Sequence, residues 1–583
     1  MFVLPFLQPI HNYPIPGFYT EVLAFALGMV ALGLLLLQRY WREVALPQIA
    51  FAPMGLFAVL LLQWALGMPT YAQTVLIALL YLLWTLFLML LGGVLRRHLG
   101  LRAISITLAW FLLVGGELSA LAGILQHYHL HSWLDHVVAA KRSVAVFGNL
   151  AQPNHFANYT ALALASLIYL RASGVAGGFG NRPYMTGLTV LAASPLLFVL
   201  GLSSSRSSWL YLLALLMLAG GWLWRNRVDI AIRNLVVSSV ALLAGFALAQ
   251  WLAQTPYFVA PSGAITASDR LFDLASGNSI RFLLHQEAWA MFWQSPLLGI
   301  GFGQFAWHHF QMGALFDHPE ITGIYNHAHN LLMQLLAETG LVGTLPLLVV
   351  GAIWLRGCWH RVGDLDGWWS FSLLTIIGIH SMLEFPLWYA HFLGIAAFLL
   401  GITETRLVRL DLQRSGRFAV ALMLLLGAMS LATMTQSYYR LQSLFFSLST
   451  SAKAKLSEAE LEQALQQLYQ ESLLVPYAEL FYAASMTLNA DRAADKLALN
   501  ERVMRFAPAR TTVYKQSILL TLNGRHAEAA LALERAFAAH PDELAAFAAA
   551  LPQLAAENPG SFDSLIKLAS IKLQENKSGV RTK

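Results

Sequence analysis

Apolar stretches long enough to cross a lipid bilayer recur along the chain between residues 18 and 436. A helix rises about 1.5 Å per residue, so it needs about 20 apolar residues to cross the hydrocarbon core. We therefore expect an all-α fold, a polytopic membrane helix bundle of about twelve spans. The predicted spans cover residues 18–38, 50–67, 72–94, 103–125, 155–170, 187–202, 208–224, 231–254, 339–355, 369–384, 386–402 and 418–436.

The composition supports the same class. Of the 583 residues, 57% are hydrophobic and only 12% are charged, and this charged fraction is about half that of a soluble protein. The first apolar stretch follows no basic segment and ends in no small-residue cleavage site, so we expect a retained span rather than a signal peptide. The single cysteine, Cys358, excludes a disulfide within the chain.

The basic residues predict an orientation. Residues 1–450 contain 22 Lys and Arg residues, and sixteen of them lie in six alternate short loops. The positive-inside rule makes those loops cytoplasmic, which places both termini and the long loop from about 255 to 338 outside. Six basic residues then remain on the outer side without a topological role: Lys141, Arg142, Arg206, Arg270, Arg281 and Arg440.

The composition changes after the last predicted span. Residues 451–583 hold fifteen acidic and fifteen basic side chains and are rich in helix-forming residues, as in a soluble helical domain. Pro476, Pro508 and Pro541 recur at spacings of 32 and 33 residues, which favours tetratricopeptide-like (TPR-like) repeats over a generic helical hairpin. The predicted domains are residues 1–254 and 339–436 for the two parts of the bundle, 255–338 for the long outer loop, and 450–575 for the TPR-like domain.

Unusual polar side chains concentrate in the outer half of the predicted bundle. Gln152 and Asn154 begin the fifth span, and His380 and Glu384 lie one turn apart near the outer end of the tenth. Polar groups are costly in a membrane, so their gathering on one side favours a single site that opens outward. Two simpler interpretations stay open: Gln152 caps a helix, and His380 bonds a neighbouring carbonyl.

Three further residues point to chemistry. His329 lies in the run Tyr325–Asn330 directly before an apolar helix, and imidazole is the side chain best suited to proton transfer near neutral pH. Arg206 stands in a serine-flanked outer turn, where a guanidinium matches phosphate oxygens. Arg281 begins an amphipathic stretch predicted to lie on the outer membrane surface.

Two other motifs are given structural interpretations. His327 and His329 stand two residues apart without cysteines or carboxylates nearby in the sequence, a weak pattern for zinc, so we expect neither a metal nor another cofactor. The glycine-rich run 296–303 follows no parallel-sheet unit, and we expect a tight turn that returns the chain to the His329 segment rather than a nucleotide site.

Four stretches together resemble the O-antigen ligase superfamily and, within it, the PglL-type protein O-oligosaccharyltransferases. They are Gly148–Asn154, the pair Ser205-Arg206, Asn326–Asn330 with Glu338–Gly343, and His380–Tyr389. The Ser-Arg and His-Asn elements are shared by ligases and polymerases, whereas the Gln-Pro-Asn element and the last stretch are more particular to protein-directed members. The family more often has tyrosine where this chain has Phe385, and Tyr389 is a candidate substitute.

The resemblance implies an activity and a location. Such enzymes take a preassembled glycan from undecaprenyl-pyrophosphate and transfer it to Ser or Thr hydroxyls of exported proteins such as pilins. They act at the periplasmic face of the bacterial inner membrane, so the outer loop 255–338 becomes the catalytic loop and the domain 450–575 becomes periplasmic. The expected partners are the lipid-linked glycan, a pilin-like acceptor protein and membrane lipid, with no nucleic acid.

Roles follow for the candidate residues. His329 would take the proton of the acceptor hydroxyl, and Arg206 and Arg281 would face the pyrophosphate leaving group. The remaining candidates would hold the sugar or orient the histidine: Gln152, Asn154, Asn330, His380, Glu384 and Tyr389.

Three alternatives stay open. Ligation to a lipopolysaccharide core or polymerisation of repeat units uses the same chemistry with another acceptor. A lipid or solute transporter is disfavoured because the spans show no internal duplication and no paired broken helices. A scaffold built around the repeat domain leaves Arg206 and His329 unexplained.

Overall fold

The computed structural model describes the chain except for residues 38–43, 131–132, 142, 175–182, 227–228, 261–262, 264, 273–277, 317–321, 362, 411–412, 450–457, 470–472 and 579–583. Of the basic residues counted for the topology, Arg39, Arg42, Arg142, Arg182 and Arg227 lie outside the described residues. In the described part of the chain the secondary structure is helical apart from two short strands, β1 (Val44–Pro47) and β2 (Leu407–Leu410). These strands pair antiparallel.

A helix occupies each of the predicted spans. In chain order these helices are α2 (Phe18–Leu37), α3 (Phe51–Ala65), α4 (Ala72–Leu99), α5 (Leu101–His127), α6 (Pro153–Ala172), α7 (Pro183–Leu202), α8 (Ser207–Arg225), α9 (Ile230–Ala253), α13 (Leu331–Arg361), α14 (Leu365–Ser381), α15 (Ala390–Thr403) and α16 (Gln413–Ser449). The short helix α1 (Leu4–Leu7) precedes them and packs against α2 and α5.

Fewer helices are suited to cross a membrane than the twelve predicted. Nine helices within the described residues are long and apolar enough, which confirms a polytopic helical membrane protein. The exceptions are α6, α14 and α15, of which α14 and α15 are short and α6 carries polar residues. Nearly all of α6 is buried between α5, α7, α8, α9 and α14, so it does not need an apolar, lipid-facing surface.

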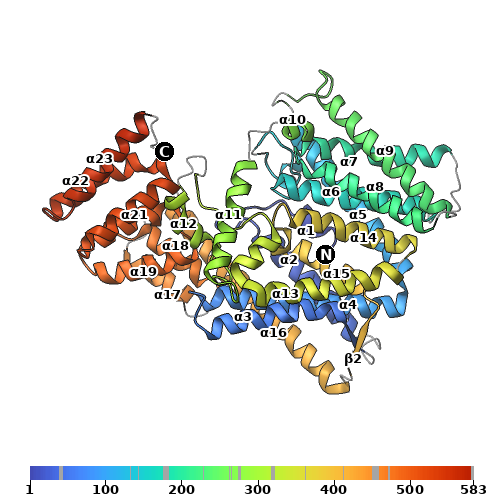
Figure 1. The fold of residues 1–583 in the computed structure, drawn as a ribbon, viewed down its shortest axis with the longest axis horizontal. Coiled ribbons are helices and arrows are strands. Elements are labelled where there is room, and N and C mark those ends of the chain that lie inside the picture. Colours follow the sequence, from blue (N-terminus) through green and yellow to red (C-terminus); the bar gives the residue numbers. More distant parts are fainter. Residues whose placement is uncertain are drawn as a thin grey trace.

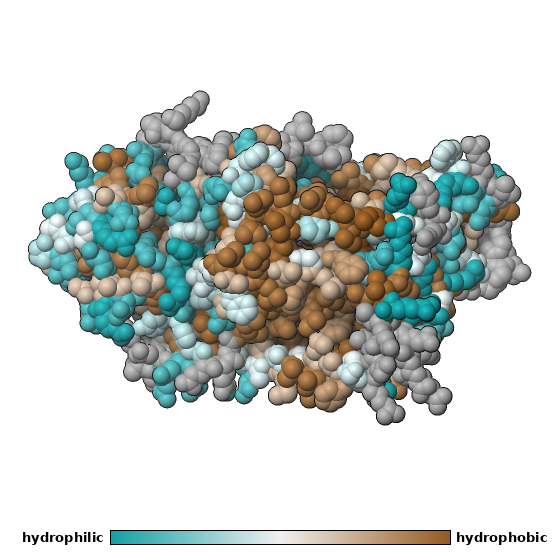
Figure 2. Space-filling view, turned by 60° about the horizontal axis from the view of Figure 1, so that its bottom comes forward, coloured by the Kyte–Doolittle hydropathy of each residue, from teal (hydrophilic) through white to brown (hydrophobic). Residues whose placement is uncertain are grey.

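The shape of the molecule agrees with a bilayer around its middle. Helices α17 (Glu458–Tyr469) to α23 (Asp563–Ser578) lie at the left end of the long axis in Figure 1, and several bundle helices run along that axis. Hydrophobic side chains gather across the middle of the face shown in Figure 2, between hydrophilic surfaces at the two ends. The hydrophobic region matches what lipid tails require of a membrane protein.

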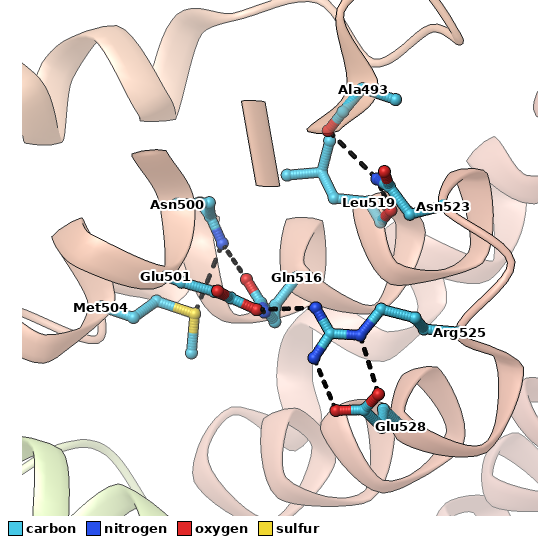
Figure 3. Close-up of polar contacts among 9 residues, drawn as sticks. All are labelled: Ala493, Asn500, Glu501, Met504, Gln516, Leu519, Asn523, Arg525 and Glu528. Carbon is cyan, nitrogen blue, oxygen red and sulfur yellow. Dashed lines mark hydrogen bonds and ion pairs between the residues drawn. The ribbon is translucent and has the colours of Figure 1, made fainter. Parts of the chain in front are cut away.

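In the C-terminal region the first five helices pack successively on one another, and the last helix packs on the fifth and the sixth. In chain order the helices are α17, α18 (Val475–Ser485), α19 (Ala493–Phe506), α20 (Arg510–Leu522), α21 (His526–Ala539), α22 (Leu544–Glu557) and α23. Figure 3 shows the polar contacts between α19, α20 and α21: buried Asn500 donates to Gln516 over 2.7 Å, and Arg525 pairs with both Glu528 (2.7 Å) and Glu501 (3.2 Å). The TPR-like nature of this domain stays a prediction.

Three short helices stand in the long loop between α9 and α13: α10 (Ala267–Phe272), α11 (Asn278–Gln294) and α12 (Phe305–Phe316). The glycine-rich run between α11 and α12 is a turn, as predicted, and it fits into a kink of α13 at Gly340. The amide of Ile300 donates to Ala337 (2.9 Å), and the amide of Leu341 donates to Pro296 (2.9 Å). A Cβ on Gly340 would lie 2.4 Å from the carbonyl oxygen of Leu297, so only glycine allows this approach.

Candidate active site

The segment that carries His329 is held by the first turn of α13. Asn330 caps this helix, since its Oδ1 accepts from the amides of Leu332 (3.0 Å) and Met333 (3.1 Å). Gln334 accepts from the amide of Ala328 over 2.7 Å. His329 itself has a φ of +52°, a left-handed conformation that is strained for a residue other than glycine. These contacts hold the imidazole at the mouth of the bundle.

Glu384 gathers side chains from three other segments. It lies in the turn after α14, where its Oε1 accepts from Asn154 Nδ2 over 2.7 Å and pairs with Arg281 Nη2 at 3.4 Å. Its Oε2 lies 3.9 Å from His329 Nε2. Asn154 begins α6, Arg281 comes from α11, and His329 precedes α13. The fold thus joins four of the residues expected to form the site around one buried carboxylate.

His329 is neutral at pH 7. Burial, followed by the charge of Arg281 and the proximity of His285, lowers the pKa of its imidazole from 6.5 to about 4. Burial is the main cause of this shift. His327, whose ring lies 3.9 Å from that of His329, is likewise kept neutral by burial, with a pKa of about 3. A neutral imidazole is the form that can accept a proton.

A cavity of about 1040 Å³ opens next to this cluster. Asn154 lines it on one side and Ser204, in the turn that leads to Arg206 and α8, on another. Its basic lining residues are Arg270, His11 and His136, and none of its described lining residues is acidic. The electrostatic environment therefore suits an anionic group.

Three family models match the chain. An O-antigen ligase model covers residues 190–348, a protein glycosylation ligase model covers 146–170, and a model of the C-terminal part of a membrane-bound virulence factor polymerase covers 368–555. A general O-oligosaccharyltransferase of Acinetobacter baylyi (strain ATCC 33305 / BD413 / ADP1) is 25% identical over 409 residues, which are 69% of this chain and 68% of that relative.

The chain is thus similar to the PglL-type oligosaccharyltransferases of the O-antigen ligase superfamily. The ligase model spans Arg206, Arg281 and His329, and the glycosylation ligase model spans Gln152 and Asn154. The polymerase model spans Glu384 together with most of the C-terminal helices. The residues that meet at Glu384 therefore come from all three matched regions.

Three residues expected to bind substrate have structural roles in this oligosaccharyltransferase. Gln152 caps α6 by accepting from the amide of His155, and this satisfies the side-chain oxygen. His380 is fully buried, and its Nδ1 lies 3.0 Å from the hydroxyl of Tyr211. The ring of Tyr389 packs against that of His155 at 4.8 Å. The structure thus shows the helix cap that was the simpler interpretation of Gln152, whereas His380 contacts a tyrosine hydroxyl rather than a neighbouring carbonyl.

Phe385, where the family more often has tyrosine, and Asn330 both make structural contacts near His329. The ring of Phe385 lies 3.7 Å from that of His327, so this residue supports the loop of His327 and His329 by packing. Asn330, expected to contact substrate, uses its oxygen for the helix cap, and its Nδ2 lies 3.5 Å from the carbonyl of Met382. It fastens the start of α13 to the end of α14.

Folding brings a carboxylate to the two histidines that have none nearby in the sequence. Ligand atoms of His327, His329 and Glu384 lie within 4.8 Å of one another, so sequence spacing does not exclude a metal here. Arg281 binds the same carboxylate, and its charge lowers the pKa of both histidines. Because Arg281 balances the carboxylate and repels a cation, we keep the interpretation without a metal.

Sequence reasoning missed several residues that build the site. Gln63, an amide inside the apolar span α3, donates to the carbonyls of Leu298 (2.7 Å) and Glu338 (2.8 Å) and so holds the glycine-rich turn on α13. A polar residue within an apolar stretch was the signal that could have found it. Arg270 was counted among the outer basic residues but was given no role.

The pH dependence of the oligosaccharyltransferase should report the depressed pKa of His329. His329 keeps its proton-accepting form until the pH falls to about 4. On the acid side kcat/KM should therefore decrease only below about pH 5, and not near pH 6.5. Arg281→Gln removes a charge that lowers this pKa and should move the acid limb to higher pH. A wild-type acid limb near 6.5, measured between pH 4 and 8, would contradict the assignment of His329 as the base.

Proposed function

We propose that this oligosaccharyltransferase transfers a preassembled oligosaccharide from undecaprenyl-pyrophosphate to Ser or Thr hydroxyls of exported proteins such as pilins. The reaction would take place at the periplasmic face of the bacterial inner membrane, with the C-terminal helical domain on the same side. The observation that carries the proposal is the cluster of His329, Glu384, Asn154 and Arg281 beside a cavity with a basic lining.

The histidine and the carboxylate support base catalysis. Glu384 faces Nε2 of His329, so we assign the imidazole proton to Nε2 and the lone pair to Nδ1, which is buried and has no hydrogen-bond partner among the described residues. We propose that Nδ1 becomes accessible when the substrates bind and accepts the proton of the acceptor hydroxyl, while the oxygen of that hydroxyl attacks the anomeric carbon. The bond from that carbon to the pyrophosphate oxygen breaks, and this direct displacement inverts the configuration of the anomeric carbon. The Glu384 carboxylate, 3.9 Å from Nε2, is too distant for a hydrogen bond in this structure, and we propose that it closes on the imidazole as in a serine-protease triad.

The leaving group needs cations. Because Arg281 pairs with Glu384, we now assign it to balancing that carboxylate rather than to the pyrophosphate. Arg270 lines the cavity, and Arg206 follows the turn whose Ser204 also lines it. We assign these two guanidinium groups to the developing negative charge on the pyrophosphate, where fixed positive charge lowers the barrier most.

A ligase or polymerase activity is the second candidate. The matches to an O-antigen ligase and to a membrane-bound polymerase favour it, since both would use the same donor side of the site with a glycan as acceptor. The two functions differ only in the acceptor, so the experiment must offer both kinds.

The experiment supplies a lipid-linked glycan and a pilin to a host without its own transferase. A gain of one glycan mass on the pilin, detected by intact mass spectrometry with the wild-type enzyme, supports protein glycosylation. A shifted lipopolysaccharide ladder with an unmodified pilin supports the ligase instead. Arg206→Lys, compared at equal membrane levels, should transfer more slowly because lysine cannot form the paired hydrogen bonds of a guanidinium.

A further inference from the structure

Helix α12 lies between the loop that carries His329 and the C-terminal domain. Phe305, His309 and Met312, spaced four and three residues apart, lie on one face of α12. Phe305 and Met312 belong to the apolar cluster that includes Ala328, next to His329. Phe310, on the other face, is buried in the core of the C-terminal domain, where α12 packs on α19 and α21. One face of this short helix thus packs beside the His329 loop, and the other packs in the core of the C-terminal domain.

A buried hydrogen bond between a histidine and a glutamate lies in the first of these interfaces. Nδ1 of His309 is 2.7 Å from Oε2 of Glu287 on α11, and their side chains are 4% and 3% exposed. A buried pair of this kind contributes little net stability compared with apolar residues of similar volume, but it can specify one arrangement of the two elements. Here it fixes the register of α12 against α11, and neither residue takes part in the reaction described above.

Both helices reach the reacting groups. Arg281 and His285 stand on α11 before Glu287; Arg281 pairs with Glu384, and His285 bonds to the backbone of Ala328. The ring of Tyr325 lies edge-on to His309 at 5.7 Å and 6.2 Å from the ring of His329. A shift of α12 along α11 would therefore move the loop of His329.

The C-terminal domain also contacts the loop directly. The amide of Gly323 donates to the carbonyl of Ala539, at the end of α21, over 2.7 Å. Ile324, the next residue, packs against the core of that domain. Four residues separate this contact from Ala328 and five separate it from His329, so the loop is attached close to its reactive part.

We propose that Glu287 and His309 are positioning residues for glycan transfer. They lock α12 to α11, so that the C-terminal domain seated on α12 sets the place of His329 and Arg281. The inference rests on the proposed function, and it gives the helical domain a role in assembling the site, whatever acceptor it binds. Misplacing a reacting group by about 1 Å can cost about 10²-fold in rate.

The test compares variants of the full-length enzyme in detergent, with undecaprenyl-pyrophosphate-linked glycan as donor and a pilin as acceptor. The double variant Glu287→Leu with His309→Leu keeps an apolar interface but loses the directional contact. It should keep its melting temperature within about 3 °C and lose kcat by about 10- to 100-fold, with a nearly unchanged KM for the donor. Glu287→Gln, which still accepts a hydrogen bond, should stay within about threefold of wild type.

Opposite results would overturn the proposal. If the double variant keeps the wild-type kcat, the pair does not position the site. If kcat and melting temperature fall together, the pair has only a structural role. A Glu287→Gln variant as slow as the double variant makes charge, not register, the decisive property. Phe310→Ala should lower kcat in the same way, whereas Phe547→Ala, which opens the same core where Phe547 packs on Tyr514, should leave kcat near wild type.

A measurement independent of transfer separates this proposal from the proposed function. Hydrogen exchange at the amides of residues 322–330 should speed up in the double variant whether or not the enzyme glycosylates a pilin. If wild type transfers no glycan but exchange still rises, the proposed function fails and the coupling stands. Unchanged exchange in an otherwise active enzyme contradicts the coupling alone.

Discussion

Replacing His329 by glutamine is expected to slow glycan transfer by about 10²- to 10⁴-fold, the usual contribution of a general base. Glutamine keeps most of the volume and a polar end but cannot take a proton at neutral pH. The loop geometry should survive, because its hydrogen bonds come from Asn330 and Gln334 rather than from the His329 ring. The rate of pilin glycosylation, followed by intact mass at equal enzyme levels, measures the effect.

A matched control is available in the same chain. His526 is an exposed residue at the start of α21, and His526→Gln should leave the rate unchanged. Transfer at the wild-type rate by His329→Gln would remove the base assignment, and His327, the neighbouring imidazole, would become the next candidate.

Glu384→Gln should slow transfer by about 10²-fold, a loss comparable to that caused by misplacing a reacting group. The amide oxygen can still accept from Asn154, but the negative charge that faces Arg281 and His329 is lost. The unbalanced guanidinium then lowers the pKa of His329 further, and the imidazole loses the group that orients it. Initial rates with saturating donor would give the size of the loss.

A double-mutant cycle separates charge balance from orientation. If Arg281 acts mainly by balancing Glu384, Arg281→Gln with Glu384→Gln should be faster than Glu384→Gln alone. Strictly additive losses would mean that the two residues act independently, for example with Arg281 on the pyrophosphate. Glu528→Gln, in an exposed pair with Arg525, serves as the control and should change nothing, since surface pairs contribute little.

The spans could be predicted from sequence because a bilayer imposes a local requirement on each of them. Length and apolarity located a helix at each expected stretch, α6 included, although its surroundings and not its own composition explain its place. The orientation of the bundle follows from arginines in loops, and the structure does not test it. The inner membrane and the periplasm therefore stay predictions.

The site was predicted as a set of residues but not as an arrangement. Asn154 and Glu384 are 230 residues apart, and no spacing rule indicates that one donates to the other. The role of Arg281 changed for the same reason, because its carboxylate partner became visible only in three dimensions. Glu287 and His309 gave no signal at all, since polar residues in an outer loop are expected to meet solvent.

The bond from Gly323 to Ala539 has an evolutionary consequence. It joins two backbone groups, so every residue that can stand at position 539 supplies the same carbonyl, and substitutions there leave the contact intact. At position 323 the φ of +97° requires glycine, and proline would have no amide to donate. Helical domains of divergent sequence can therefore support the same loop. The only residue type that this contact requires is the glycine at position 323.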